Sequence, residues 1–193
     1  PKSLQGQNNP RQTWYKVAAI TVSVIWVTAF TLMITYELGP KTKTIALAGN
    51  ISISLMVGLV IIYGAASLDS IDNPAVWYAG SVAFFVNLAR EIVKDVEDID
   101  GDKGRKTLPM LTSKRISRIV SWFLCLIAII LLAAPYYIGI FALWSIIFQL
   151  PAMLILLKLN VTLNAGDDTK AQKNMKTGML LGLLGFLMSV FFN

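Results

Sequence analysis

Six apolar stretches of about 20 residues each run along the 193-residue chain and set the main constraint on its fold. An α-helix rises about 1.5 Å per residue, so a stretch of this length crosses the hydrocarbon core of a bilayer. Strands are disfavoured because the alternation of apolar and polar residues that marks a membrane barrel is absent. The sequence therefore predicts an all-α, polytopic transmembrane helical bundle, with spans at residues 15–36, 45–66, 75–92, 119–137, 138–159 and 177–192.

The composition agrees with this class and limits the chemistry. Hydrophobic residues make up 55% of the chain and charged residues only 15%, which is too little charge for the surface of a soluble domain. There is no histidine, so the commonest proton relay is excluded. The single cysteine, Cys125, lies within an apolar stretch and is expected to be a core residue. We expect no nucleic-acid partner, because the net charge of +6 has a simpler origin in membrane topology, and nothing indicates an obligate protein partner.

The distribution of basic residues predicts how the chain is oriented. All 17 Lys and Arg lie in four clusters, at residues 2–16, 41–43, 90–118 and 158–176, whereas the connections 67–75 and 134–140 have none. Basic loops stay in the cytoplasm, so the four clusters should share that side of the cell membrane. One span alone separates the first two clusters. Either the first cluster faces out, or this stretch joins the remnants of two helices; the second interpretation is preferred.

The segment 87–109 gathers charge where the third span would leave the membrane. If its helix continues to residue 102, four carboxylates lie within about 60° of one another. These are Glu91, Asp95, Asp98 and Asp102, whereas Glu97 and Asp100 project from other faces. Grouped carboxylates repel one another unless a cation offsets them, and hard oxygen ligands suit Mg²⁺.

Basic residues lie among and beyond these acids, and the mixture suits a metal-bound diphosphate better than a bare ion. They are Arg90, Lys94, Lys103, Arg105 and Lys106. The alternative is an ordinary cytoplasmic loop whose charges pair with each other at i, i+4 spacing.

At these residues the chain resembles a known family. "REIVKDVEDIDGD" (90–102) followed by "RKTLP" (105–109) resembles the second aspartate-rich motif of the UbiA superfamily of intramembrane prenyltransferases. The resemblance is greatest to its archaeal branch, the digeranylgeranylglyceryl phosphate synthases. "YELGPKTKTIALAGN" (36–50) is similar to the family's lysine-containing loop and the Gly-Asn pair after it.

The resemblance implies a function. The family uses Mg²⁺ to transfer a prenyl group from an isoprenoid diphosphate, and this branch transfers geranylgeranyl from its diphosphate to geranylgeranylglyceryl phosphate. That reaction forms the second ether bond of archaeal membrane lipids, at the cytoplasmic side of the cell membrane. The expected partners are therefore the isoprenoid diphosphate donor, the lipid-phosphate acceptor and membrane lipid.

The resemblance also implies roles for particular residues. Catalytic roles fall to Asp95, Asp98 and Asp102, and metal binding to these three together with Glu91. The expected substrate-binding residues are Lys41, Lys43, Asn50, Arg90, Lys94, Arg105 and Lys106.

The chain also departs from the family pattern. The family has nine transmembrane helices and a first aspartate-rich motif at the end of the second helix. Here about six to seven helices are represented and that motif is absent. We therefore expect residues 1–193 to form a single membrane-embedded prenyltransferase domain that lacks the first two helices.

Two other functions compete with this interpretation. A UbiA-type enzyme acting on an aromatic acceptor, in quinone or haem biosynthesis, is the nearest alternative. A cation transporter would need ionisable residues deep within several spans, whereas the centres of these spans carry no charge. "GMLLGLLG" (178–185) is expected to serve helix packing, through Gly178, Gly182 and Gly185.

Overall fold

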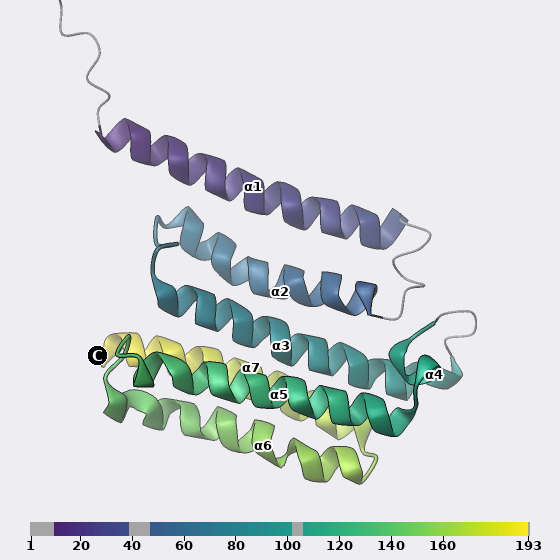
Figure 1. Cartoon of the computed structure of the whole chain (residues 1–193). Coiled ribbons are helices and arrows are strands. Elements are labelled where there is room, and N and C mark those ends of the chain that lie inside the picture. The colour runs from purple at the N-terminus through teal and green to yellow at the C-terminus, as the bar shows by residue number, and fades with distance from the viewer. Residues whose placement is uncertain (1–9, 39–46, 102–105, 193) are drawn as a thin grey trace, which may run out of the picture.

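The computed structural model describes residues 10–38, 47–101 and 106–192 of the chain (Figure 1). Its long helices are α1 (Pro10–Leu38), α2 (Ala48–Ser67), α3 (Pro74–Glu97), α5 (Lys114–Tyr137), α6 (Leu150–Asn164) and α7 (Asp168–Phe191). The shorter elements are α4 (Leu108–Leu111) and two 3₁₀ segments, η1 (Asp98–Asp100) and η2 (Leu143–Gln149). No strand occurs within these described ranges, which confirms the predicted all-α class.

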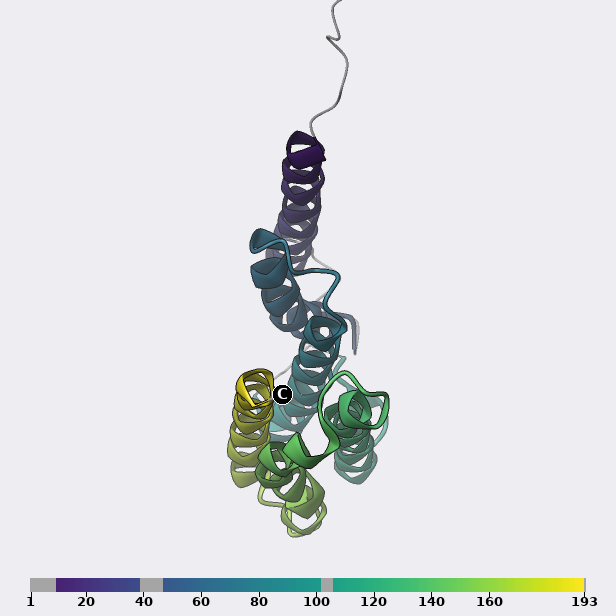
Figure 2. The same cartoon turned by 90° about the vertical axis from the view of Figure 1, so that its left-hand side faces the viewer.

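Helix α3 lies at the centre of the arrangement and packs against α2, α5 and α7. Seen end-on, α1, α2 and α3 form a row one helix thick, and α5, α6 and α7 gather at its α3 end (Figure 2). In the described part of the chain α1 packs against α2 and makes no other extensive contact. The central position of α3 is reflected in its buried residues, which include Val82, Ala89 and Val93.

Helices α5 and α7 begin earlier than the apolar stretches that predicted them, because polar caps set their starts. Ser113 accepts a hydrogen bond from the Ile116 amide at 3.1 Å and begins α5, and Asp167 accepts one from the Lys170 amide at 3.1 Å and begins α7. A side-chain oxygen at this position satisfies an amide that the helix itself leaves unpaired. The predicted spans at 119–137 and 177–192 therefore identified the membrane-spanning parts but not the helix ends.

Five helical segments of the described chain are long and apolar enough to cross a membrane: Tyr15–Thr35, Ala48–Ser67, Lys114–Tyr137, Leu143–Asn164 and Asp168–Phe191. This number of spans makes the protein a multi-pass membrane protein. The span predicted at 75–92 is the helix α3, which is not among the five. Its last third carries five charged residues, and three neighbouring helices surround it in place of lipid.

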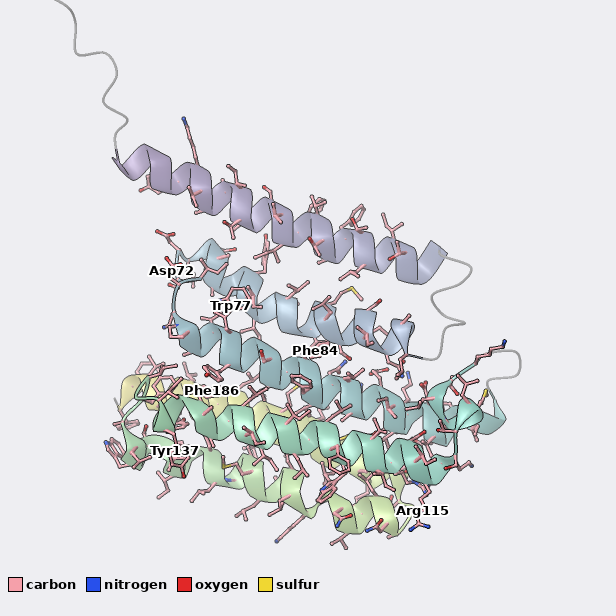
Figure 3. The ribbon with its side chains drawn as sticks, viewed as in Figure 1. Asp72, Trp77, Phe84, Arg115, Tyr137 and Phe186 are labelled. Atoms are coloured by element: carbon pink, nitrogen blue, oxygen red, sulfur yellow. The ribbon has the colours of Figure 1, made fainter. Side chains whose placement is uncertain are left out.

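The two ends of the bundle differ in charge. Figure 3 shows Asp72 and Tyr137 at one end and Arg115 at the opposite end. The described residues of the third and fourth basic clusters lie at the Arg115 end, and the two connections without basic residues lie at the other, as expected. Lys16, the residue of the first cluster whose side chain the structure describes, differs from the expectation. Because α1 is one continuous helix, Lys16 near its start lies at the Asp72 end.

Glycines set the spacing of the helices, as expected for 178–185. An added Cβ would lie 2.8 Å from Leu156 at Gly178, 2.9 Å from Leu132 at Gly182, and 2.8 Å from the Phe148 carbonyl oxygen at Gly185. Cys125 is fully buried in the same core, which confirms its expected role.

The glycines of α2 supply a matched test of close packing. A Cβ at Gly58 would lie 2.8 Å from the backbone carbonyl oxygen of Gly80 on α3, whereas one at Gly64 would meet nothing within 4 Å. We expect Gly58→Ala to lower the free energy of unfolding by about 1–3 kcal/mol, because a backbone oxygen cannot move aside. Gly64→Ala should leave stability unchanged or raise it by up to about 1 kcal/mol. Thermal unfolding of both variants in detergent is the measurement, and equal effects would contradict this account of α2–α3 packing.

Candidate functional site

The charged end of α3 presents two adjacent edges. At about 100° per residue, Arg90, Lys94 and Glu97 share one edge of the helix. The carboxylates Glu91, Asp95 and Asp98 occupy the next. The α-helix ends at Glu97 and the chain continues as the 3₁₀ turn η1, so Asp98 caps the helix rather than lying within it. The sequence predicted that this helix continues to residue 102, whereas in the structure the α-helix ends at Glu97.

The acidic edge is held from the α2 side. Asn50, in the first turn of α2, donates a hydrogen bond from Nδ2 to Asp95 Oδ2 at 2.7 Å. Asn87 Nδ2 donates to Ser54 Oγ at 3.1 Å, and Ser54 Oγ donates to the Asn50 carbonyl oxygen at 2.6 Å. These contacts form a polar seam between α2 and α3 that orients both Asn50 and Asp95.

Glu91 is buried and paired with its neighbour. Arg90 Nη1 donates to Glu91 Oε1 at 2.7 Å, and the Arg90 side chain keeps about a third of its surface exposed. A buried carboxylate needs such a partner, because an unpaired charge in an apolar surrounding is costly. Lys94 and Asp98 are exposed, and Asp95 is half-buried.

The other edge of α3 faces the start of α7. Glu97, which the sequence placed on a different face from the four carboxylates, accepts hydrogen bonds from Thr169 Oγ1 at 2.6 Å and from Gln172 Nε2. The start of α7 is fixed in turn by Arg118 of α5, which donates from Nε and Nη2 to the two carboxylate oxygens of Asp168. This bidentate pair sets the position of the α7 side chains relative to α3.

Sequence reasoning missed one group of residues at this end. Lys173 and Lys176 of α7 line a depression of about 250 Å³ together with Arg90, Thr169 and Gln172. The signal available in the sequence was that the fourth basic cluster should lie at the same end as the acidic segment. Spacing along the chain gave no reason to join residues some 80 positions apart.

Several expected site residues cannot be placed. Lys41, Lys43, Asp102 and Arg105 lie outside the described residues, and Lys106 is exposed just before α4. The structure therefore joins Asn50 with Asp95 and Arg90 with Glu91, and leaves the remaining expected contacts as predictions.

The described donors suit Mg²⁺ in kind. Within residues 10–38, 47–101 and 106–192 no three Asp, Glu or Cys side chains converge as a metal site. Mg²⁺ often binds through one or two carboxylates and completes its shell with water and substrate phosphate oxygens. Asp95, already oriented by Asn50, and the exposed Asp98 supply carboxylate oxygens of this type.

An apolar groove of about 400 Å³ lies between α1 and α2. Trp26, Phe30 and Met33 line it from α1, and Met56 and Tyr63 are among its α2 residues. Met56 is six residues, or roughly 9 Å, further along α2 than Asn50. The groove lies on the α1 side of α2, whereas the polar seam lies on its α3 side.

Comparison with known proteins gives a consistent result. A profile of the UbiA prenyltransferase family matches residues 15–190. The digeranylgeranylglyceryl phosphate synthase of Methanopyrus kandleri is 36% identical over 168 residues, which cover 85% of this chain and 61% of the relative. The protein of the same name from Pyrococcus abyssi is 31% identical over 150 residues, covering 77% and 53%. The chain thus spans between about half and two thirds of the length of these curated relatives.

A solved structure supports the same fold. It is described as digeranylgeranylglyceryl phosphate synthase in membranes and aligns with a TM-score of 0.75 at 26% identity. The alignment covers 88% of this chain and 61% of the other. The arrangement of helices described above is therefore similar to that of a known membrane enzyme.

The Asn50–Asp95 contact yields a pH-dependent prediction. Asn50→Asp replaces a donor by a second carboxylate, so the two charges should lower the free energy of unfolding by about 1–3 kcal/mol at pH 7.5. Protonation of either carboxyl removes the repulsion, so the difference from the wild type should shrink as the pH falls to 5. Asn160→Asp, at an exposed position of α6, is the control. Thermal unfolding at both pH values is the measurement, and identical behaviour of the two variants would argue against the contact.

Proposed function

Because the chain belongs to the UbiA prenyltransferase family, we propose that it acts as a membrane-embedded prenyltransferase domain. Its reaction transfers geranylgeranyl from geranylgeranyl diphosphate to geranylgeranylglyceryl phosphate and forms the second ether bond of archaeal lipids. The observation that carries this proposal is the similarity to curated digeranylgeranylglyceryl phosphate synthases over most of the chain, the charged end of α3 included.

The donor diphosphate binds at the acidic edge of α3 in this proposal. Asp95, Asp98 and Asp102 are the catalytic carboxylates, and with Glu91 they are the residues that would hold Mg²⁺. When bound, the metal neutralises charge on the departing pyrophosphate. Further contacts to the phosphates come from basic and amide side chains, namely Lys41, Lys43, Asn50, Arg90, Lys94, Arg105 and Lys106.

The residues of this chain contribute mainly by orientation. Asn50 fixes one oxygen of Asp95 and so orients that carboxylate at the α2 side of α3. Arg90 offsets the buried charge of Glu91, so that the acidic edge does not repel the diphosphate as strongly. The allylic carbon becomes electron-poor as the diphosphate leaves, and the apolar bundle keeps water away from it.

The apolar groove between α1 and α2 is the proposed site of the prenyl tail. The groove begins about one and a half turns beyond Asn50 and is lined by Trp26, Phe30 and Tyr63. A concave apolar surface of this kind suits an isoprenoid chain. We place the charged end of the bundle at the cytoplasmic side, because the third and fourth basic clusters lie there.

A cation transporter is disfavoured by the polar groups inside the bundle. Far from the charged end, Tyr136 and Ser189 lie 2.6 Å apart through their hydroxyl oxygens, and Gln149 Nε2 donates to Tyr136 at 3.1 Å. These buried groups are uncharged and bind one another. An ion path would need ionisable side chains along it.

Removal of the acidic side chains tests the site. We expect Asp98→Ala and Asp102→Ala each to lower prenyl transfer about a hundredfold or more, because each removes an anchor of the group that stabilises the leaving diphosphate. Asp72→Ala, at the opposite end of the bundle, should leave the rate unchanged. The measurement is turnover of labelled geranylgeranyl diphosphate by detergent-solubilised protein. Full activity in both α3-end variants would rule out this assignment.

Chelation and acceptor choice test the reaction. We expect EDTA to abolish transfer and added Mg²⁺ to restore it, since the carboxylates repel the diphosphate without a cation. With geranylgeranylglyceryl phosphate and an aromatic acceptor offered together, label should enter the glyceryl product. Preferential labelling of the aromatic acceptor would instead assign the chain to the quinone or haem branch.

A further inference from the structure

The depression between α3 and α7 is positively charged. Arg90 enters it from α3, and Lys173 and Lys176 enter it from successive turns of α7. Both lysines are exposed, and neither forms an ion pair with any residue that the structure describes. The nearby carboxylates are already engaged, since Glu97 accepts hydrogen bonds from Thr169 and Gln172, and Glu91 is paired with Arg90. An anion entering the depression therefore meets the ammonium groups of Lys173 and Lys176 and the guanidinium of Arg90.

The depression reaches about two helical turns from the end of α3 and the start of α7, towards the middle of the bundle. Arg90 is seven residues from the end of α3, or roughly 10 Å, and Lys176 is eight residues from the start of α7, or roughly 12 Å. The apolar part of α7 follows directly, with Gly178, Met179 and Leu180. A ligand with an anionic head and a long apolar tail fits this boundary, because its head meets the cations while its tail continues along apolar surface.

The two edges of α3 suit two different anions. A diphosphate that carries Mg²⁺ is attracted to the carboxylates at the acidic edge, whereas a phosphate without metal is repelled there. The depression offers the reverse, because three cationic side chains line it, and it suits a metal-free phosphate. Arg90 belongs to both edges, since it lines the depression and is bonded to Glu91.

We propose that Arg90, Lys173 and Lys176 form the subsite that binds the phosphate monoester of the lipid acceptor, in the depression that Thr169 and Gln172 also line. This inference rests on the proposed function and assigns the acceptor to α7 and the donor to the α2 side of α3. The short glycerol backbone requires the acceptor phosphate to sit close to the reacting hydroxyl. Placement on the edge of α3 next to the donor site satisfies that requirement.

Binding of lipids to the purified, detergent-solubilised chain tests the subsite without relying on turnover. Native mass spectrometry with geranylgeranylglyceryl phosphate should show about tenfold weaker binding to a Lys173→Gln, Lys176→Gln double variant than to the wild type. Geranylgeranylglycerol, which lacks the phosphate, should bind both proteins equally. Lys158→Gln, at an exposed position near the same end of α6, is the matched control and should bind like the wild type. A Lys173→Arg, Lys176→Arg variant keeps the charge and should restore binding.

Two binding outcomes would overturn the subsite. One is unchanged binding of the phosphate monoester by the double Gln variant. The other is an equal loss of phosphatidylglycerol, which would make the depression a site for membrane headgroups in general. In transfer assays the double variant should raise the acceptor KM about tenfold and leave the donor KM unchanged. Phosphate-dependent binding by a wild type that transfers nothing to this acceptor would support the subsite and refute the proposed function.

Discussion

The rest of the structure depends on keeping the charges of α3 out of lipid. Five charged residues lie in the last third of this helix, and a helix that carries them cannot stand alone in a bilayer. Helices α2, α5 and α7 surround α3, so its polar end faces protein and the aqueous edge. Within that shelter Glu91 is paired with Arg90, Asp95 is bonded to Asn50, and Glu97 is bonded to α7. The burial of α3 by its neighbours and the pairing of its charged side chains thus both follow from the need to keep these charges out of lipid.

Close approach of the helix backbones holds these polar side chains within hydrogen-bonding distance of one another. Gly58 and Gly80 let α2 and α3 meet with almost no side chain between them, and the seam of Asn50, Ser54 and Asn87 lies further along the same interface. On the other flank, the bidentate pair of Arg118 and Asp168 fixes the start of α7. In a membrane, small residues and polar bonds replace the hydrophobic drive that packs helices in water.

The sequence predicted the features that depend on local pattern. Apolar length gave the all-α membrane class, and the contiguous run from Arg90 to Asp102 gave the family, which the profile match confirms. It could not give the features that depend on which helices are neighbours. The bonds of Glu97 to Thr169 and Gln172 join positions more than 70 residues apart. Charge counting placed the first basic cluster on the same side as the others, whereas the continuous helix α1 puts Lys16 at the opposite end.

Helices α2 and α7 each pack on α3 but make no extensive contact with each other in the described part of the chain. The Asn50 contact and the Lys173 depression are therefore linked mainly through the helix between them, α3. Substitutions on α7 can then alter the Lys173 depression while the Asn50–Asp95 contact keeps its geometry. If α7 binds the acceptor as proposed, substitutions on α7 are a simple evolutionary route to new acceptors with the same donor.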